Sequence, residues 1–447
     1  MASNERDDSL RLISTSEELA QACEQLAKGD FLALDTEFHR ESTYWPQLCL
    51  IQAATSDYDV MIDPLAGLDL APFLELVADE SRVKVFHAAR QDIEIFARLL
   101  GKPPGPIFDT QIAEMACGLG DSISYENIVS KVLKQQVDKS SQFTDWTRRP
   151  LSEKQLHYAR GDVTYLREIY VWLRNRLEKR DRVHWIEDEH AALTDPALYA
   201  FDPELAWKRL KIRKYKPDYL ALLARTAAWR EQLAQDIDKP RGRILKDDAL
   251  QEIAQQRPAS AEALDRLRAV PKGFSRSKHG QSLVEMIQET LADPKAYAPQ
   301  MERPASSGPP AGALSDLLRV LLKQVSDEED VAPRLIANAA DLERIAREDA
   351  PEIAALTGWR REVFGEKALA LIAPLVNATR EEPGNISYGF YEDLVSPGAF
   401  QLHEIWENQA ALDAHMQTAH MAAFNEAVGT IEVLELSIEF FDATKRA

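Results

Sequence analysis

Apolar positions in the first 200 residues follow two different periods, which predicts a mixed α/β domain. Short apolar runs with strand character occupy residues 31–34, 48–54, 58–62 and 83–86. Longer stretches with helical spacing cover residues 88–100 and 151–177. Strands mixed with helices in this way are typical of a sheet that is covered by helices. We therefore expect residues 1–200 to form one α/β domain.

The middle of the chain has helical spacing throughout, with breaks at proline. Between residues 203 and 290 the pattern is interrupted at Lys239-Pro240 and Arg257-Pro258. The segment 302–312, ERPASSGPPAG, has the composition of a linker. We therefore predict two all-α domains, at 205–290 and 313–368, that are joined by a linker at 291–312.

Strand signals return near the C-terminus. Runs with strand character lie at residues 386–391, 400–406 and 431–440, and a helical pattern covers residues 408–428. This mixture predicts a small α+β segment over residues 369–447.

Composition is that of a soluble globular protein with room for about three domains at roughly 150 residues each. The chain has 447 residues, 45% of them hydrophobic and 28% charged. No run reaches the roughly 18 apolar residues that a membrane helix requires, so we expect no membrane association. The polar start, MASNERDDSL, contains no apolar signal segment. Three cysteines without a CxxC pair favour a reducing compartment, and we expect a cytoplasmic protein.

Charge is distributed unevenly along the chain. The net charge of −20 argues, by itself, against a nucleic-acid partner. Residues 205–290, however, carry 18 basic and 11 acidic side chains, whereas residues 366–447 carry 4 and 13. The densest basic stretch, 207–216, includes Lys211, Arg213 and Lys214. A basic run is commonly a solvated helix face, but this contrast favours a surface that faces phosphates.

Two acidic side chains follow the first apolar strand. Asp35 and Glu37 are two residues apart, so the strand period places both on one face. Two adjacent carboxylates are costly unless a cation neutralises them, and oxygen ligands of this kind suit Mg²⁺ or Mn²⁺. The ordinary alternative is a solvated strand end with two surface acids.

Three further side chains, all in predicted helices, are candidates for a catalytic site. Tyr158 and Asp162 are four residues apart and share one helix face, where a phenol above a carboxylate can orient a metal-bound water. Asp92 lies in the first turns of the helix that follows the strand at 83–86. Each has an ordinary alternative: a half-buried tyrosine beside an exposed aspartate, and an aspartate that stabilises a helix dipole.

In this order and spacing, the acidic motifs together resemble the DEDD superfamily of 3′→5′ exonucleases in its tyrosine variant. The resemblance to the ribonuclease D family extends over residues 10–368, on the segments FLALDTEF (31–38), FHAARQD (86–92), DWTRRPL (145–151) and YARGDVTYL (158–166). The basic block resembles the HRDC domain, and residues 313–368 resemble a second HRDC-like repeat. No GxxxxGK[ST] motif is present, so a helicase is excluded.

This resemblance implies a ribonuclease H-like α/β fold, two divalent metal ions and a set of catalytic residues. The metal ligands would be Asp35, Glu37, Asp92 and Asp162, and Tyr158 would position the attacking water. The expected reaction is hydrolysis of the 3′-terminal phosphodiester, which releases nucleoside 5′-monophosphates. The expected substrate is RNA, with tRNA precursors as the family substrate. Asp109, by contrast, precedes a helical pattern and is interpreted as an N-cap.

Six further side chains are candidates for substrate contact, each with packing as its alternative. His39 and Arg40 follow the Asp-x-Glu motif directly and could reach the terminal nucleotide or a phosphate. Trp45 and Gln47 lie in a loop where the family contacts substrate. Arg148 and Arg149 precede Pro150, and an arginine near a metal site could clamp a phosphate.

The C-terminal segment resembles a different family. Residues 366–447, with SYGFY (387–391) and FQLHEIW (400–406), are similar to the antibiotic-biosynthesis monooxygenase (ABM) domain, a dimeric ferredoxin-like fold. The first strand of that fold is missing, because the preceding residues 359–365 belong to the HRDC-like block. An open sheet edge favours pairing with another chain, so we expect a homodimer through this segment.

Alternatives to an exoribonuclease remain open at this point. They are a 3′→5′ exonuclease on single-stranded DNA, and an RNA-binding protein with a second, ABM-type activity.

Overall fold

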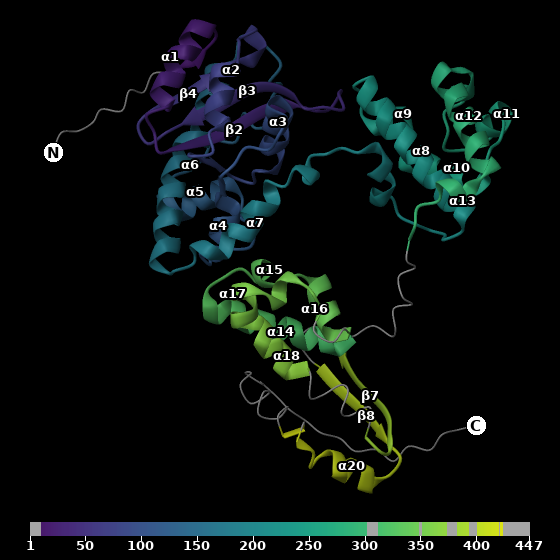
Figure 1. The fold of residues 1–447 in the computed structure, drawn as a ribbon. Helices are drawn as coiled ribbons and strands as arrows, with labels where there is room; N and C mark the ends of the chain where they lie inside the picture. The colour runs from purple at the N-terminus through teal and green to yellow at the C-terminus, as the bar shows by residue number, and fades with distance from the viewer. Residues whose placement is uncertain are drawn as a thin grey trace. The chain divides into compact units, whose positions relative to one another are not determined.

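The computed structural model describes residues 10–301, 312–347, 351–372, 382–392, 400–419 and 421–422 (Figure 1). The chain forms two compact units. The first comprises Met1–Ala113 and Ser124–Ser306, and the second comprises Glu114–Ile123 and Ser307–Ala447.

A mixed sheet organises the first unit. It has six strands in the order β1-β4-β3-β2-β5-β6. The strands are β1 (Leu12–Ile13), β2 (Phe31–His39), β3 (Gln47–Ala54), β4 (Asp59–Ile62), β5 (Val83–Phe86) and β6 (Ile107–Asp109). Strand β3 is antiparallel to β2 and β4, and the other neighbours are parallel. The predicted α/β class is therefore confirmed.

Helices cover both faces of this sheet. On one face lie α1 (Ser16–Leu26), α2 (Ala71–Ala78) and α3 (Arg90–Leu100). Their apolar residues share a core with Leu32 and Leu34 of β2. The long helix α6 (Glu153–Lys179) packs across β2, β3, β4 and β5, and Tyr170 of α6 contacts the Phe31 ring. Odd-numbered residues of β2 therefore face α6, and even-numbered residues face α3.

Strand β2 is longer than its apolar run predicts. The sequence suggested that the strand ends at the two acids, but β2 continues to His39 because its backbone pairs with β3 as far as His39 opposite Gln47. Asp35 and Glu37 therefore lie inside a paired strand. Helix α6 begins two residues later than predicted. Ser152 caps it by accepting a hydrogen bond from the Gln155 amide, while the Gln155 side chain accepts one from the Ser152 amide.

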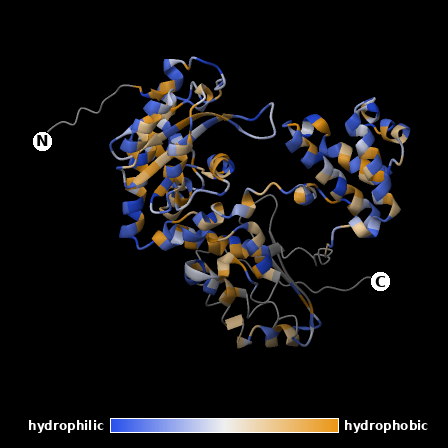
Figure 2. Cartoon of the chain, turned by 45° about the horizontal axis from the view of Figure 1, so that its top comes forward, coloured by the Kyte–Doolittle hydropathy of each residue, from blue (hydrophilic) through white to orange (hydrophobic). Residues whose placement is uncertain are grey.

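Shorter helices complete the sheet domain. They are α4 (Thr110–Ala116), α5 (Tyr125–Leu133) and α7 (Glu187–Leu193). Figure 2 shows mainly apolar residues along the strands and hydrophilic residues on the outer surfaces of the helices, as a sheet buried between helical layers requires.

The first predicted helical domain is also helical in the structure. It contains the 3₁₀ turn η4 (Pro203–Arg209) and helices α8 (Pro217–Asp236), α9 (Arg241–Ile244), α10 (Asp247–Gln256), α11 (Ala261–Asp265), α12 (Lys278–Ala292) and α13 (Pro294–Tyr297). Helices α8 and α10 end just before the two predicted proline breaks. A single apolar core joins η4, α8, α10 and α12.

The second unit is helical and then β-hairpin. Its elements are α14 (Gly312–Glu329), α15 (Pro333–Ile336), α16 (Ala339–Arg347), α17 (Gly358–Arg360), a π-helical turn (Arg361–Gly365), α18 (Glu366–Ile372), β7 (Asn385–Glu392), β8 (Phe400–Trp406) and α20 (Gln409–His415). Strands β7 and β8 lie where the sequence predicted strands, and they pair antiparallel. Residues 358–365, where a first ABM strand would lie, are helical.

Two predictions for the C-terminal segment are tested only in part. The helix predicted at 408–428 begins at Gln409, with Asn408 accepting a hydrogen bond from the Ala411 amide. The strand predicted at 431–440 lies outside the described residues. Among the helices that are described, none combines the length and the apolar character needed to cross a bilayer.

Candidate active site

Three carboxylates converge where β2 meets α6. Asp35 and Glu37 extend from the α6-facing side of β2, and Asp162 comes from α6 itself. One ligand oxygen from each of the three lies within 4.8 Å of the other two. The predicted pairing of Asp35 with Glu37 on one face is thus present, and the fold brings Asp162 to it across more than a hundred residues.

Asp92 approaches from the opposite side of β2. It lies in the first turn of α3, and its carboxylate accepts a 2.5 Å hydrogen bond from the Thr36 hydroxyl. Thr36 is the residue between the two acids, so its side chain faces α3 rather than α6. Asp92 is not one of the three converging carboxylates, but its charge raises the pKa values of Asp35, Glu37 and Asp162.

Asp109 fixes the start of α3. Its carboxylate accepts hydrogen bonds from the backbone amides of Ala88 (3.0 Å) and Ala89 (2.8 Å), which directly precede that helix. It also accepts one from the Gln111 amide at 2.8 Å, which confirms its interpretation as an N-cap. Asp109 therefore orients the turn that carries Asp92 and remains outside the carboxylate cluster.

The carboxylates of this site repel one another, with Asp92 and Asp162 buried and Asp35 and Glu37 half-buried. Burial, followed by the charges of Asp92 and Asp162, raises the pKa of Asp35 well above its usual value. Burial and the neighbouring aspartates raise the pKa of Glu37 to about 9. Burial raises the pKa of Asp92 to about 7, against the opposing effect of the Thr36 hydrogen bond. Burial, and then the charges of Glu37 and Asp92, likewise raise the pKa of Asp162.

This cluster fits a divalent metal. Within the described residues, none of the four carboxylates forms an ion pair with lysine or arginine. Clustered carboxylates with raised pKa values become stable as anions when a cation is bound, and oxygen donors are preferred by hard divalent ions. The donor set therefore matches a divalent metal site.

Tyr158 lies beside this cluster. It is half-buried, packs with its ring centroid 6.1 Å from that of Trp146, and lies one helical turn before Asp162, whose pKa its phenol lowers. Burial, and then the charges of the three carboxylates, raise the pKa of the Tyr158 phenol, so it stays protonated and can donate a hydrogen bond.

Two residues that support the site were missed by sequence reasoning. Thr36 holds Asp92, and the hydroxyl proton of Tyr125 of α5 is shared between the carbonyls of Gly161 (3.0 Å) and Asp162 (2.7 Å). Thr36 could have been found, because it lies between two metal-ligand candidates in the strand. No local signal marked Tyr125, since its role depends on the packing of α5 against α6.

Three of the four candidate contacts at the end of β2 and in the following loop are engaged within the protein. His39 Nε2 lies 3.1 Å from the Ser42 hydroxyl. Arg40 forms an ion pair with Glu94 at 2.8 Å. The Trp45 ring lies under the Arg98 guanidinium, 3.5 Å from its carbon. Gln47 begins β3 with an exposed side chain.

Arg148 and Arg149 differ sharply in availability. All five N–H groups of Arg149 donate within the protein, to the Asp63 carboxylate and to the carbonyls of Cys49, Trp146 and Arg148. Arg148 pairs with Asp145 at 3.1 Å, and its side chain is 84% exposed. A phosphate would therefore meet Arg148 more readily than Arg149.

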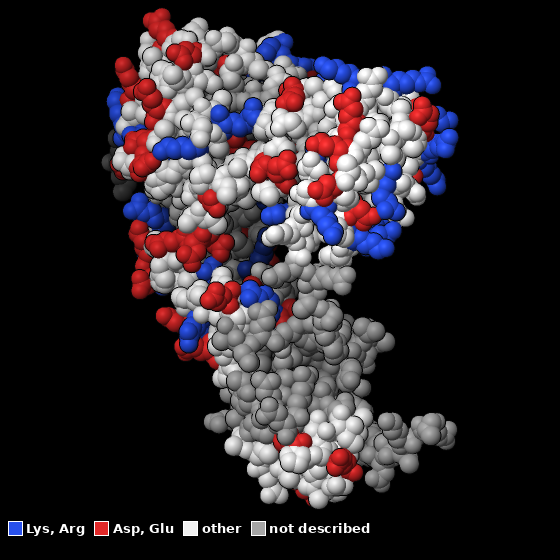
Figure 3. Space-filling view, turned by 45° about the vertical axis from the view of Figure 1, so that its right-hand side comes forward, with Lys and Arg blue, Asp and Glu red and all other residues white. Residues whose placement is uncertain are grey.

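The basic stretch of the helical domain is exposed. Lys211, Arg213 and Lys214 lie in an extended segment between η4 and α8, and within the described residues they form no ion pair. Figure 3 shows one face of the molecule, with Lys and Arg side chains gathered at the upper right, where Figure 1 places helices α8 to α12.

Comparison with known protein families identifies three regions of this chain. Residues 10–178 match the 3′-5′ exonuclease family, residues 220–287 match the HRDC domain, and residues 362–427 match the antibiotic biosynthesis monooxygenase family. The HRDC match covers the first helical domain; a second HRDC-like repeat stays a prediction.

Proteins named ribonuclease D are similar over most of the chain. The protein from Granulibacter bethesdensis is 48% identical over 371 residues, which cover 83% of this chain and 94% of that protein. The protein from Nitrobacter hamburgensis is 49% identical over 361 residues, covering 80% and 94%. The crystal structure of Escherichia coli RNase D, described as an exoribonuclease involved in structured RNA processing, superposes with a TM-score of 0.71 at 29% identity, over 80% of this chain and 97% of that one. The chain therefore belongs to the ribonuclease D family of 3′→5′ exoribonucleases, and it carries an ABM-like region at its C-terminus.

Proposed function

We propose that this exoribonuclease removes single nucleotides from RNA 3′ ends by metal-dependent hydrolysis and releases nucleoside 5′-monophosphates. The observation that carries this proposal is the convergence of Asp35, Glu37 and Asp162 within 4.8 Å, with Asp92 held at their side by Thr36. We propose Asp35, Glu37, Asp92 and Asp162 as ligands of two Mg²⁺ or Mn²⁺ ions. When bound, such ions supply Lewis-acid activation of water and charge stabilisation at the phosphate.

The protein's own groups orient the reactants. Tyr158 presents a protonated phenol beside Asp162, where it can donate a hydrogen bond to the attacking water and fix its direction. Tyr125 anchors the backbone turn of α6 that carries Asp162. Thr36 holds Asp92 by a hydrogen bond, and Asp109 holds the turn that directly precedes α3. Positioning of this kind lowers the barrier because the reacting groups need no rearrangement.

Structured RNA with a single-stranded 3′ extension is the proposed substrate class, with tRNA precursors as the proposed cellular substrate in the cytoplasm. Exposed Arg148, near the site, and the basic stretch at 207–216 support contact with a phosphate backbone. We also propose His39, Arg40, Trp45 and Gln47 as substrate contacts.

The organisation of the chain follows from this assignment. We propose the exonuclease domain at 1–200, the HRDC domain at 205–290, a linker at 291–312, a second HRDC-like domain at 313–368 and the ABM-like segment at 369–447. The helical structure of residues 358–365 supports a shortened ABM fold. We propose that this segment mediates homodimer formation and is not the site of a second activity.

A cleavage assay on a tRNA with a labelled 3′ extension tests the function. We expect stepwise shortening in Mg²⁺, release of nucleoside 5′-monophosphates detected by chromatography, and no cleavage in EDTA. Release of nucleoside 3′-phosphates, or a 3′-phosphate on the shortened RNA, would contradict the proposed reaction. Equal cleavage of single-stranded DNA of the same sequence would favour the DNA exonuclease alternative.

A further inference from the structure

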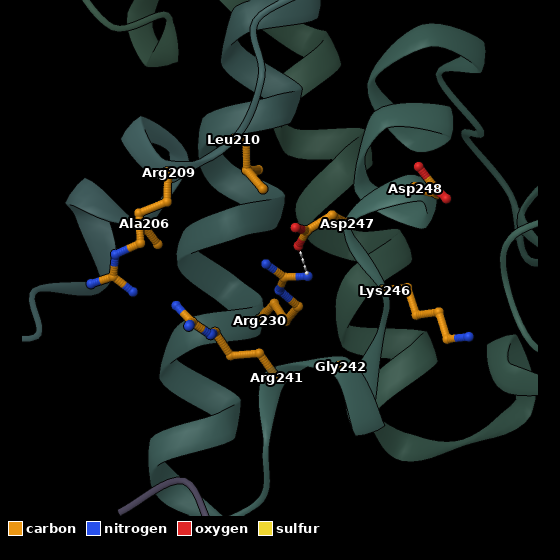
Figure 4. Close-up of a pocket in the computed structure, with 9 residues that line it drawn as sticks. All are labelled: Ala206, Arg209, Leu210, Arg230, Arg241, Gly242, Lys246, Asp247 and Asp248. Atoms are coloured by element: carbon orange, nitrogen blue, oxygen red, sulfur yellow. Dashed lines mark hydrogen bonds and ion pairs between the residues drawn. The ribbon is translucent and has the colours of Figure 1, made fainter. Parts of the chain in front are cut away.

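A cavity of about 530 Å³ lies in the HRDC domain (Figure 4), and none of the cluster carboxylates lines it. It is bounded by η4, α8, α9 and the start of α10. Its lining contains four cationic side chains, Arg209, Arg230, Arg241 and Lys246, and two acidic ones, Asp247 and Asp248. We call it the arginine pocket. The proposed hydrolysis at the carboxylate cluster assigns no role to these residues.

A buried glutamate organises two of these arginines. Glu231 of α8 has no exposed side-chain surface, and its two carboxylate oxygens accept hydrogen bonds from Arg209 (3.1 Å) and Arg241 (3.3 Å). Each arginine gives only one Nη group to Glu231. Both arginine side chains are partly open to solvent, with 43% of Arg209 and 41% of Arg241 exposed. Glu231 thereby holds both guanidinium groups in place, and each of them keeps N–H donors for a further acceptor.

The remaining charges of the pocket have distinct roles. Arg230 is nearly buried and is occupied by Asp247 at 2.7 Å and by the Leu245 carbonyl. Figure 4 shows this pair in the middle of the pocket, with Arg209 and Arg241 on one side of it and Lys246 on the other. Lys246 is exposed and forms no ion pair within the described part of the chain. Arg209, Arg241 and Lys246 are therefore the cations that a ligand can reach.

From this arrangement we infer that the arginine pocket binds a phosphate group of the RNA substrate other than the one that is hydrolysed. The inference rests on the proposed function. A phosphodiester fits because planar guanidinium forks bind phosphate oxygens in a bidentate manner, and pre-ordered arginines lose less conformational entropy on binding. The pocket is polar and open, so it does not suit an apolar ligand.

Glu231 also connects this pocket to the strand that carries the catalytic acids. The Tyr44 hydroxyl, in the loop between β2 and β3, donates a hydrogen bond to the same carboxylate. The Asp238 carboxylate, just after α8, accepts hydrogen bonds from the amides of Tyr44 (2.9 Å) and Trp45 (3.0 Å). A phosphate in the pocket would therefore be held at a fixed place relative to β2.

Binding measurements on the full-length protein test this inference. A fluorescein-labelled, 3′-extended tRNA is titrated in EDTA, where no cleavage occurs, and its Kd is measured by anisotropy at several salt concentrations. We expect Arg209→Gln and Arg241→Gln each to raise the Kd by about tenfold, as for one charged hydrogen-bonded contact. The slope of log Kd against log salt should fall by about 0.7 for each phosphate of a single strand that the variant no longer neutralises.

Two further variants separate contact from folding. In either arginine variant Glu231 keeps one arginine and Tyr44, so we expect the fold to persist, which thermal melting checks. Lys246→Gln removes a cation without a structural partner and should also weaken binding. Arg257→Gln serves as the matched control, because Arg257 is an exposed arginine paired with Asp218 at the other end of α10, and its Kd should equal that of the wild type.

Three outcomes would overturn the inference. One is an unchanged Kd and salt slope in Arg209→Gln, Arg241→Gln and Lys246→Gln. Another is an equally weakened Kd in Arg257→Gln, which would indicate general charge rather than a pocket. A third is binding of inorganic phosphate or a free nucleoside 5′-monophosphate that depends on these residues while RNA binding does not. Failure of the proposed function is distinguishable, since it would appear as absence of RNA cleavage by the wild-type protein in Mg²⁺.

Discussion

The carboxylate cluster on the sheet and the arginine pocket of the HRDC domain concentrate charge of opposite sign, and they differ in how that charge is balanced. Asp35, Glu37 and Asp162 face one another without a described cationic partner, and their pKa values rise as a result. Arg209 and Arg241, by contrast, share the buried Glu231. The first site is complete only when a cation is added, whereas the second is already neutralised in part and can accept one more anion.

This difference suits the carboxylate cluster to catalysis and the arginine pocket to substrate binding. A site that lacks its counter-charge can bind a metal strongly and can stabilise charge that develops during hydrolysis. A site whose charges are already paired stabilises the charge of a transition state less strongly. It can still bind a phosphate group of the substrate and hold it in position. Changes in the cluster should therefore act on the catalytic rate, and changes in the pocket should act on binding.

The largest expected effect comes from removing a proposed metal ligand. We expect Asp35→Asn or Asp162→Asn to reduce single-turnover cleavage of RNA by about 10³-fold or more, because metal stabilisation is worth several kcal/mol. Thermal melting should show a folded protein. Asp57→Asn, which changes an exposed carboxylate in the turn between β3 and β4, is the matched control and should cleave normally. Cleavage rates near that of the wild type in the Asp35 and Asp162 variants would contradict their assignment as metal ligands.

Loss of the phenol should be the next largest effect. We expect Tyr158→Phe to slow hydrolysis by about 10²-fold at saturating Mg²⁺, since orienting water is worth a few kcal/mol. RNA Kd and metal dependence should hold, because the ring still packs on Trp146. If turnover is unchanged, Tyr158 is only a packed aromatic.

Thr36 should matter less, and only through Asp92. We expect Thr36→Val to lower activity at limiting Mg²⁺ by about tenfold, because a hydrogen bond to a charged group contributes roughly 1.5–3 kcal/mol. Thr36→Ser restores the hydroxyl and should recover most of the activity. Equal losses in the serine and valine variants would show that packing against α3, rather than the hydrogen bond, is responsible.

The metal-free protein should show the repulsion directly as a pH dependence of stability. The pKa values of Glu37 and Asp92 are raised to about 9 and about 7, so the folded state retains protons that the unfolded state has lost above its usual carboxyl pKa values. These groups therefore make the free energy of unfolding fall as pH rises from about 4 towards 9. In EDTA, Glu37→Gln should gain in Tm over the wild type as pH increases from 5 to 8. A Tm difference that is independent of pH would contradict this electrostatic explanation.

The smallest effect is expected from the region that holds neither site. Removing residues 373–447, after α18, should leave turnover within about twofold, since all proposed catalytic groups lie before residue 163 and distant changes add little to the barrier. Sedimentation should show a shift from dimer to monomer. A large drop in cleavage would show that the ABM-like segment contributes to the active site, and an unchanged oligomeric state would exclude it as the dimer interface.

Much of the fold and the core of the site could be predicted, because periodicity and motif spacing are local. The strand at 83–86, the proline breaks after α8 and α10, and the shared face of Asp35 and Glu37 all follow from residues that are neighbours in sequence. The position of Asp162 came from a family resemblance, since no local rule brings α6 onto β2.

What could not be predicted depends on long-range contacts. Arg149 suggested a phosphate clamp, yet its donors are taken by Asp63, which lies 86 residues away in sequence. The basic run drew attention to Lys211, Arg213 and Lys214. The pocket instead pairs Arg209 of the same run with Arg241, and only the packing of η4 and α9 around Glu231 brings these two together. Counting charged residues along a sequence does not reveal contacts of this kind between distant residues.

The placement of groups on both faces of β2 ties the active site to one register of the sheet. Pairing β2 with β3 one residue out of step would turn Asp35 and Glu37 towards α3 and Thr36 towards α6, because side chains alternate along a strand. No carboxylate pair would then face Asp162, and Asp92 would lose its hydroxyl partner. A sheet with the wrong register, or a sheet that is only partly formed, therefore lacks this carboxylate cluster altogether and does not contain a weaker form of it. During folding, metal affinity should arise abruptly with the correct strand pairing, so a bound ion selects the native register and stabilises it against every slipped alternative.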